Sequence, residues 1–174
     1  LSGRPASPPS QRASELRITA VAVHGSGPIP EQRVISALAL TTGEIFDFSE
    51  WQRDRERVEA LYHDEGYYEA RIDARRAEDG STVALMYAIA PGPRGEITVS
   101  GHGLGGDTLD RIRTAWSQAV VDQFLVDEVQ EIVRGDLARE GYLRPKVAVS
   151  FRLQPEAGAE KMLSVAIEPG PRAT

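Results

Sequence analysis

The clearest candidate for chemistry in this chain is Gly101-His102-Gly103-Leu104-Gly105-Gly106, which satisfies the pattern G-x-G-x-x-G. In dinucleotide-binding proteins this spacing lets the backbone approach a pyrophosphate at the start of a helix. Such a site also needs a second parallel strand that ends in an acidic residue about 20 residues further on. Two helical patterns with no strand between them follow the motif instead. We therefore predict a loop here and keep a nucleotide-binding enzyme fragment that uses Gly101–Gly106 as an alternative.

Other residue types with catalytic or metal-binding chemistry are few. The chain has no cysteine, which excludes disulfides, thiolate nucleophiles and cysteine zinc sites. It has only three histidines, His24, His63 and His102, too few for a His-rich metal cage. The carboxylates are spread along predicted helix surfaces, as expected of solvated faces. We therefore expect a protein that is not an enzyme and that has no metal and no cofactor.

The composition is that of an ordinary soluble globular protein. Of the 174 residues, 41% are hydrophobic and 26% are charged. The net charge of −6 argues against binding to nucleic acid. Residues 1–15, rich in Pro and Ser, carry too little apolar surface to fold, so we expect a disordered linker, with a proline-rich ligand for an SH3-type groove as the alternative. Because the chain begins at Leu1, we interpret it as a mature or excised fragment.

The remainder of the chain is a repeat of about 76 residues. Asp64-Glu65-Gly66-Tyr67 matches Arg139-Glu140-Gly141-Tyr142, and Ile89–Arg94 matches Ile167–Arg172. A third match, Val21–Gly25 with Ile97–Gly101, keeps the same order. We therefore predict two consecutive domains, residues 16–93 and 94–172.

Each repeat has the same predicted order of elements, β-α-α-β-β. In the first, residues 17–24 alternate as a strand, residues 30–40 have helical spacing, and Ser49 with Gln52 forms a capping box before the second helix. In the second, Asp107 is a plausible N-cap. Gly66 and Gly141 supply the left-handed position that ends the second helix of each repeat, and Asp79-Gly80 predicts a hairpin turn.

These elements predict an α+β fold in which two helices cover one face of each three-stranded sheet. The default position for the aromatic residues on apolar stripes is the core: Trp51, Tyr62, Tyr87, Trp116 and Phe151. Of the adjacent Tyr67 and Tyr68, we expect one to pack and the other to be exposed, where an exposed tyrosine beside a strand edge would suit peptide binding.

The predicted function lies at the sheet edges. The strand after the second helix begins a hairpin, so one of its sides lacks a partner and could pair with a client strand by β-augmentation. Its outward polar positions would be Glu69, Arg71, Asp73 and Arg75 in the first repeat, and Lys146, Ala148, Ser150 and Arg152 in the second. The charges of the first edge are equally typical of a strand protected from aggregation. The second edge carries fewer charges, so we expect it to bind more strongly.

The two repeats resemble tandem POTRA (polypeptide-transport-associated) domains of BamA- and TamA-type outer-membrane assembly proteins. The resemblance rests on the motifs Val21-x-Val23-x-Gly25, Gly43-x-x-Phe46, Leu61-Tyr62-x-x-x-Gly66-Tyr67-x-x-Ala70-x-Ile72 and Ile89-x-x-Gly92-Pro93, and in the second repeat Ile97-x-Val99-x-Gly101, Leu137-x-x-x-Gly141-Tyr142 and Ile167-x-x-Gly170. It covers nearly everything after residue 15.

The resemblance implies a periplasmic polypeptide-binding scaffold of an outer-membrane β-barrel assembly or translocation factor. Its partners would be unfolded outer-membrane or secreted polypeptides, a C-terminal membrane β-barrel in the parent chain, and accessory assembly proteins. The barrel that attaches such domains to the outer membrane is not part of these 174 residues. A two-partner secretion transporter carries the same kind of domain and stands as the alternative.

Overall fold

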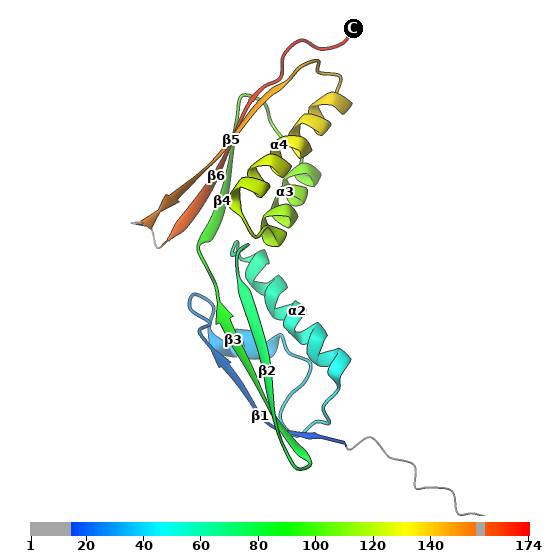
Figure 1. Cartoon of the computed structure of the whole chain (residues 1–174), viewed down its shortest axis with the longest axis vertical. Coiled ribbons are helices and arrows are strands. Elements are labelled where there is room, and N and C mark those ends of the chain that lie inside the picture. The colour runs from blue at the N-terminus through cyan, green and yellow to red at the C-terminus, as the bar shows by residue number, and fades with distance from the viewer. Residues whose placement is uncertain (1–14, 156–158) are drawn as a thin grey trace, which may run out of the picture.

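The computed structural model describes residues 15–155 and 159–174. Residues 1–14, which hold almost all of the predicted linker, lie outside the described residues. The described chain forms two three-stranded sheets, each with its helices on one face, stacked end to end along the long axis of the molecule (Figure 1). The predicted α+β class and the order β-α-α-β-β are confirmed for both repeats.

The first sheet has the strand order β1-β3-β2. Its elements are β1 (Arg17–His24), α1 (Glu31–Ser36), α2 (Phe48–Asp64), β2 (Arg71–Asp79) and β3 (Thr82–Ala90). Strand β1 runs parallel to the central strand β3, and β2 runs antiparallel to it. The predicted hairpin is present, with Gly80 at φ 59° in the turn between β2 and β3.

The second sheet repeats this topology in the order β4-β6-β5. Its elements are β4 (Arg94–Ser100), α3 (Gly106–Gln118), α4 (Asp122–Arg139), β5 (Lys146–Gln154) and β6 (Glu160–Glu168). Strand β4 is parallel and β5 antiparallel to the central β6. In both sheets, the strand after the second helix therefore lies at an edge.

Helix α2 begins before the predicted capping box. Its N-cap is Asp47, whose side chain accepts a hydrogen bond from the amide of Glu50 at 2.8 Å, so the Ser49–Gln52 prediction is wrong. The earlier start places Phe46 before the cap and Trp51 in the first turn, where their rings meet at 5.7 Å as a hydrophobic staple. This apolar contact adds to the carboxylate cap and fixes where the helix begins.

Helix α1 is shorter than the predicted 30–40 because a buried carboxylate binds the chain after it. Asp54 of α2 is fully buried and accepts hydrogen bonds from the amides of Ala39, at 2.8 Å, and Leu40, at 2.9 Å. Those amides are therefore not available for a continued helix. Helix α3 also differs from the prediction, because its N-cap is Gly105 and not Asp107, which lies in the first turn.

Both second helices end in a Schellman motif, as the glycines predict. The amide of Tyr67 donates to the carbonyl of Tyr62 at 2.9 Å, and Gly66, at φ 93°, occupies the left-handed position. In the second repeat, the amide of Tyr142 donates to the carbonyl of Leu137 at 2.9 Å, with Gly141 at φ 92°. The local sequence thus ends both helices in the same way.

Each sheet has its own hydrophobic core beneath its helices. Tyr62, Tyr87 and Trp116 are fully buried, while Trp51 and Phe151 are half-buried against the cores. The Tyr62 hydroxyl donates to the carbonyl of Ser26 at 2.6 Å, and burial raises the pKa of Tyr62 to about 12. Among the described residues, no helix combines the length and apolarity needed to cross a membrane.

Candidate functional site

Neither β2 nor β5 pairs with a further strand on its outer edge in the described part of the chain. Among the described residues, the only backbone partners of β2 and β5 are β3 and β6. The opposite edge of the first sheet is partly covered, because the amide of Ile18 in β1 donates to the carbonyl of Glu44 and its carbonyl accepts from Gly43, both at 2.8 Å. The backbone groups that could pair with an added strand therefore include those on the outer edges of β2 and β5.

The four polar residues predicted for the first edge do not act together. Asp73 and Arg75 lie exposed on β2 and form an ion pair at 2.7 Å. Glu69 precedes β2 and binds Lys161 of β6 at 3.0 Å, and the guanidinium of Arg71 donates to the carbonyl of Ala119 at 3.4 Å. Glu69 and Arg71 thus reach into the second repeat and hold the joint between the repeats.

The four residues predicted for the second edge are all exposed to solvent. Lys146, Ala148, Ser150 and Arg152 are all exposed on β5, and Lys146 lies 3.6 Å from Glu168. The opposite, helix-facing side carries Val147, Val149, Phe151 and Leu153. Leu153 is 59% exposed although it lies on the apolar side of the strand.

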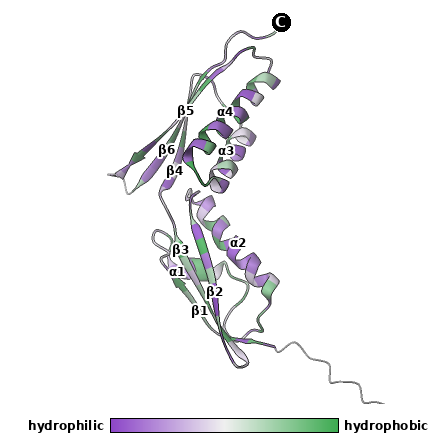
Figure 2. Ribbon diagram, viewed as in Figure 1, coloured by the Kyte–Doolittle hydropathy of each residue, from purple (hydrophilic) through white to green (hydrophobic). Residues whose placement is uncertain are grey.

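An aromatic cluster beside β2 was missed in the sequence. The guanidinium of Arg76 lies over the rings of Phe46, Phe48 and Trp51, at 5.2, 5.6 and 5.5 Å from their centroids. Phe48 is 51% exposed, and Figure 2 shows this hydrophobic start of the otherwise largely hydrophilic α2. The close spacing of the three aromatic residues was the available signal; that Arg76 covers them follows only from the fold.

An apolar cavity lies beside β5 at the corresponding place. It has a volume of about 520 Å³ and is lined by Pro93, Asp122, Phe151, Leu153, Ala159 and Lys161. The Lys161 ammonium lies 4.8 Å from the centre of the Phe151 ring. At the start of α4, Val120, Val121 and Phe124 are also exposed. The second edge is therefore flanked by exposed apolar side chains, although Lys161 lies over the Phe151 ring as Arg76 lies over the first cluster.

Lys161 binds the two repeats to each other. Its ammonium donates to Glu69 at 3.0 Å and to Asp122 at 2.7 Å. Burial alone would lower the pKa of Lys161, but the hydrogen bonds to Asp122 and Glu69 outweigh burial and the pKa is raised. The lysine therefore stays charged near neutral pH, and its charge is balanced by a carboxylate from each side of the joint.

The joint also has an aromatic contact. Tyr68 reaches from the first repeat into the second core, where its ring lies 5.0 Å from that of Trp116. Tyr67 packs against Tyr62 with ring centres 6.1 Å apart. The expectation that one of the two tyrosines is exposed is therefore wrong, because each packs into a different core.

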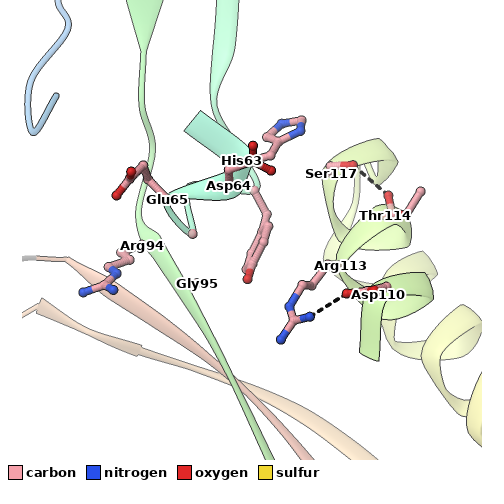
Figure 3. Close-up of a pocket in the computed structure, with 11 residues that line it drawn as sticks. His63, Asp64, Glu65, Arg94, Gly95, Asp110, Arg113, Thr114 and Ser117 are labelled. Carbon is pink, nitrogen blue, oxygen red and sulfur yellow. Dashed lines mark hydrogen bonds and ion pairs between the residues drawn. The ribbon is translucent and has the colours of Figure 1, made fainter. Parts of the chain in front are cut away.

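A groove of about 560 Å³ runs along this joint (Figure 3). His63, Asp64 and Glu65 at the end of α2 face Asp110 and Arg113 of α3 across it, and Arg113 is paired with Asp110 at 2.7 Å. The groove carries charges of both signs, so it does not select an anion or a cation. Burial lowers the pKa of His63, an effect to which the nearby Arg71 adds and which Glu59 and Asp64 oppose.

The first glycine of the G-x-G-x-x-G motif has a structural explanation. A Cβ on Gly101, which has φ 86°, would lie 1.9 Å from the carbonyl oxygen of Ile167, and Gly25 makes the same approach to Ile89 at 2.4 Å. Strand β4 reaches its parallel neighbour β6 only after α3, α4 and β5, so the segment does not have the strand–helix–strand order of a dinucleotide fold. In the described part of the chain, no group of three or more His, Asp or Glu side chains could hold a metal ion.

Comparison with known proteins gives a family for part of the chain. Residues 16–92 match the POTRA family, described as surface antigen variable number repeat. No curated protein matches the chain. Three similar solved structures are POTRA3-5 of BamA from Haemophilus influenzae, POTRA1-2 of the periplasmic domain of Omp85 from Anabaena, and CdiB from Escherichia coli. Each is 14% identical, with TM-scores of 0.48, 0.43 and 0.42. The matches cover 90%, 91% and 98% of this chain and 67%, 98% and 30% of the respective structures.

Proposed function

From the match of residues 16–92 to the POTRA family, we propose that the chain is a polypeptide-binding scaffold. It holds extended segments of outer-membrane or secreted polypeptides in the periplasm and delivers them to a membrane β-barrel. Its two domains are residues 16–93 and 94–172, and its role is binding and not catalysis. Accessory assembly proteins are further partners.

The observation that carries this proposal is the open outer edge of β5 next to an apolar cavity. A client strand that pairs with β5 gains backbone hydrogen bonds, which tolerate many sequences. At the end of β5, its side chains on the helix side would enter the cavity of about 520 Å³ beside Phe151 and Leu153. The backbone supplies general affinity and the cavity selects large apolar side chains.

The edge of β2 is the weaker of the two sites. Arg76 already lies over the aromatic cluster, and Asp73 and Arg75 pair with each other on the opposite face. A client at β2 must displace or accommodate these charged side chains, which adds to the cost of ordering the client. We therefore assign β5 as the principal site.

The orientation of the β5 backbone indicates where to block it. The side-chain amide of Gln130 donates to the carbonyl of Val147 at 3.4 Å, so this carbonyl points away from β6. Alternate residues of a strand direct their backbone groups to the same side, so the amide of Val149 also points outward. Proline at position 149 removes that donor, whereas alanine keeps it and loses a similar part of the apolar side chain.

The test is a titration with a short blocked peptide that alternates valine and tyrosine with threonine, followed by amide chemical shifts. We expect shifts along residues 146–154 and around the cavity, with affinity at least ten-fold weaker in Val149→Pro than in Val149→Ala. Circular dichroism of both variants checks that the fold is kept. Shifts that cluster on the helices or on Gly101–Gly106, or equal affinities of the two variants, would contradict the proposal.

A further inference from the structure

The apolar cavity beside β5 is not built by the second repeat alone. Pro93, one of its lining residues, belongs to the short segment between β3 and β4 that joins the repeats. Lys161, another lining residue, donates to Glu69 of the first repeat at 3.0 Å and to Asp122 of the cavity wall at 2.7 Å. The cavity is therefore completed by a lysine that the first repeat helps to hold in place.

A second route from the cavity to the first repeat runs through aromatic rings. The Phe151 ring, in the cavity wall, meets the Trp116 ring edge-on with centres 5.3 Å apart. Trp116 in turn packs on Tyr68 of the first repeat with ring centres 5.0 Å apart. The Lys161 ammonium lies 4.8 Å from the centre of the same Phe151 ring. Phe151 therefore contacts two residues, Trp116 and Lys161, each of which binds the first repeat directly.

The two carboxylates fix the position of the Lys161 side chain. A lysine that is free to change rotamer must be ordered when a ligand packs against it, and this ordering costs free energy. The side chain of Lys161 is only 12% exposed and is already held by a carboxylate from each repeat. Without Glu69 it would keep the bond to Asp122, whose side chain is 59% exposed. Because Glu69 is not among the residues that line the cavity, its effect on a client would come through Lys161.

We propose that Glu69 is a positioning residue of the client site on β5, and that filling the cavity and seating the first repeat on the second stabilise each other. This inference rests on the proposed function, because it concerns the same edge and the same cavity. Coupling between two equilibria is reciprocal. If the bond between Lys161 and Glu69 raises the affinity for an extended client segment, the bound segment must stabilise the joint by the same factor.

The test compares two variants of the full chain that carry the same change of charge, using the blocked valine, tyrosine and threonine peptide. Glu69→Gln removes the carboxylate that holds Lys161, and Glu56→Gln removes an exposed carboxylate from α2 of the same repeat. We expect at least three-fold weaker affinity in Glu69→Gln and unchanged affinity in Glu56→Gln. When Lys161→Met is already present, Glu69→Gln should have no further effect on affinity.

The reverse direction of the coupling is measured with spin labels. The chain has no cysteine, so Arg55→Cys on α2 and Glu128→Cys on α4 place one label in each repeat, both at exposed positions. We expect saturating peptide to narrow the distribution of distances between the labels. In Glu69→Gln this narrowing should be reduced by at least half.

Amide shifts in the same titration separate this inference from the proposed function. Shifts along residues 146–154 with equal affinities in Glu69→Gln and Glu56→Gln would overturn the coupling and leave the client site standing. A distance distribution that saturating peptide leaves unchanged would do the same. A further loss of affinity on adding Glu69→Gln to Lys161→Met would show that Glu69 does not act through the lysine. Absence of shifts along residues 146–154 would overturn both the coupling and the client site.

Discussion

Gly95→Ala should weaken the joint between the repeats, because the added methyl group competes with an aromatic pair. The new Cβ would lie 2.4 Å from Cδ2 of Tyr68 and 2.9 Å from Cη2 of Trp116. Trp116 is only 1% exposed and cannot move aside, whereas Tyr68 is half-buried and can rotate out. We therefore expect the mutation to displace Tyr68 from its position on Trp116.

The free energy of this displacement has three parts. Loss of the aromatic pair costs about 0.5–1.5 kcal/mol, and re-exposing a half-buried ring costs about 1 kcal/mol more. Alanine in place of glycine restores about 0.4–1 kcal/mol by restricting the unfolded chain. The second repeat should therefore lose about 1 kcal/mol of unfolding free energy. Tyr68→Leu in the same chain makes room for the methyl group, so the double variant should be more stable than Gly95→Ala alone.

The assay is urea unfolding followed by tryptophan fluorescence. The chain has two tryptophans, and Trp51→Phe leaves Trp116 as the sole reporter of the second repeat. Gly95→Ala, Tyr68→Leu, the double variant and the unsubstituted chain form a double-mutant cycle. We expect its coupling energy to be favourable by about 1 kcal/mol, within the range for residues in contact. If the two substitutions change the unfolding free energy additively, or if Gly95→Ala is as stable as the unsubstituted chain, then the added methyl group does not displace Tyr68 from Trp116.

Four other changes test separate parts of the fold. Gly101→Ala should lower the unfolding free energy by about 3 kcal/mol, because left-handed strain and a backbone clash combine. Gly103→Ala has nothing within 4 Å of its new Cβ, so its unfolding free energy, measured in the same thermal melts, should stay within about 0.5 kcal/mol of the unsubstituted chain. Gly66→Ala should cost about 1 kcal/mol from φ alone, because its Cβ meets only ordinary contacts; an unchanged melting curve would contradict this. The lowered pKa of His63 means that the unfolded state binds more protons, so stability should be complete above about pH 6.5 and fall as the pH drops through the lowered pKa. The urea midpoint of His63→Gln, measured over the same pH range, should not show this decline. Tyr87→Phe removes a buried hydroxyl that has no hydrogen-bond partner among the described residues, and should raise the unfolding free energy by up to about 1 kcal/mol in a urea titration.

Local features of the fold were predictable because they depend on neighbours in the sequence. The alternation of the strands and the two helix-ending glycines involve residues a few positions apart, and the repeat is visible as matching segments in the same order. The capping box at Ser49 was misplaced by a short distance, because Asp47 provides a stronger cap and Phe46 meets Trp51 across it. The end of α1 was missed for a different reason: it is set by Asp54, a residue of the next helix.

The sequence by itself determined that the chain contains two β-α-α-β-β units and which strands alternate polar and apolar residues. Only the tertiary structure decided what those residues contact. Glu69 was expected at a client edge but binds Lys161, a residue 92 positions away. The sequence did not show whether Tyr68 lies in the core or on the surface, and in the structure its ring packs on Trp116. The physical reason is that side-chain periodicity specifies which face of an element is buried, whereas the partner on that face is set by how distant segments pack.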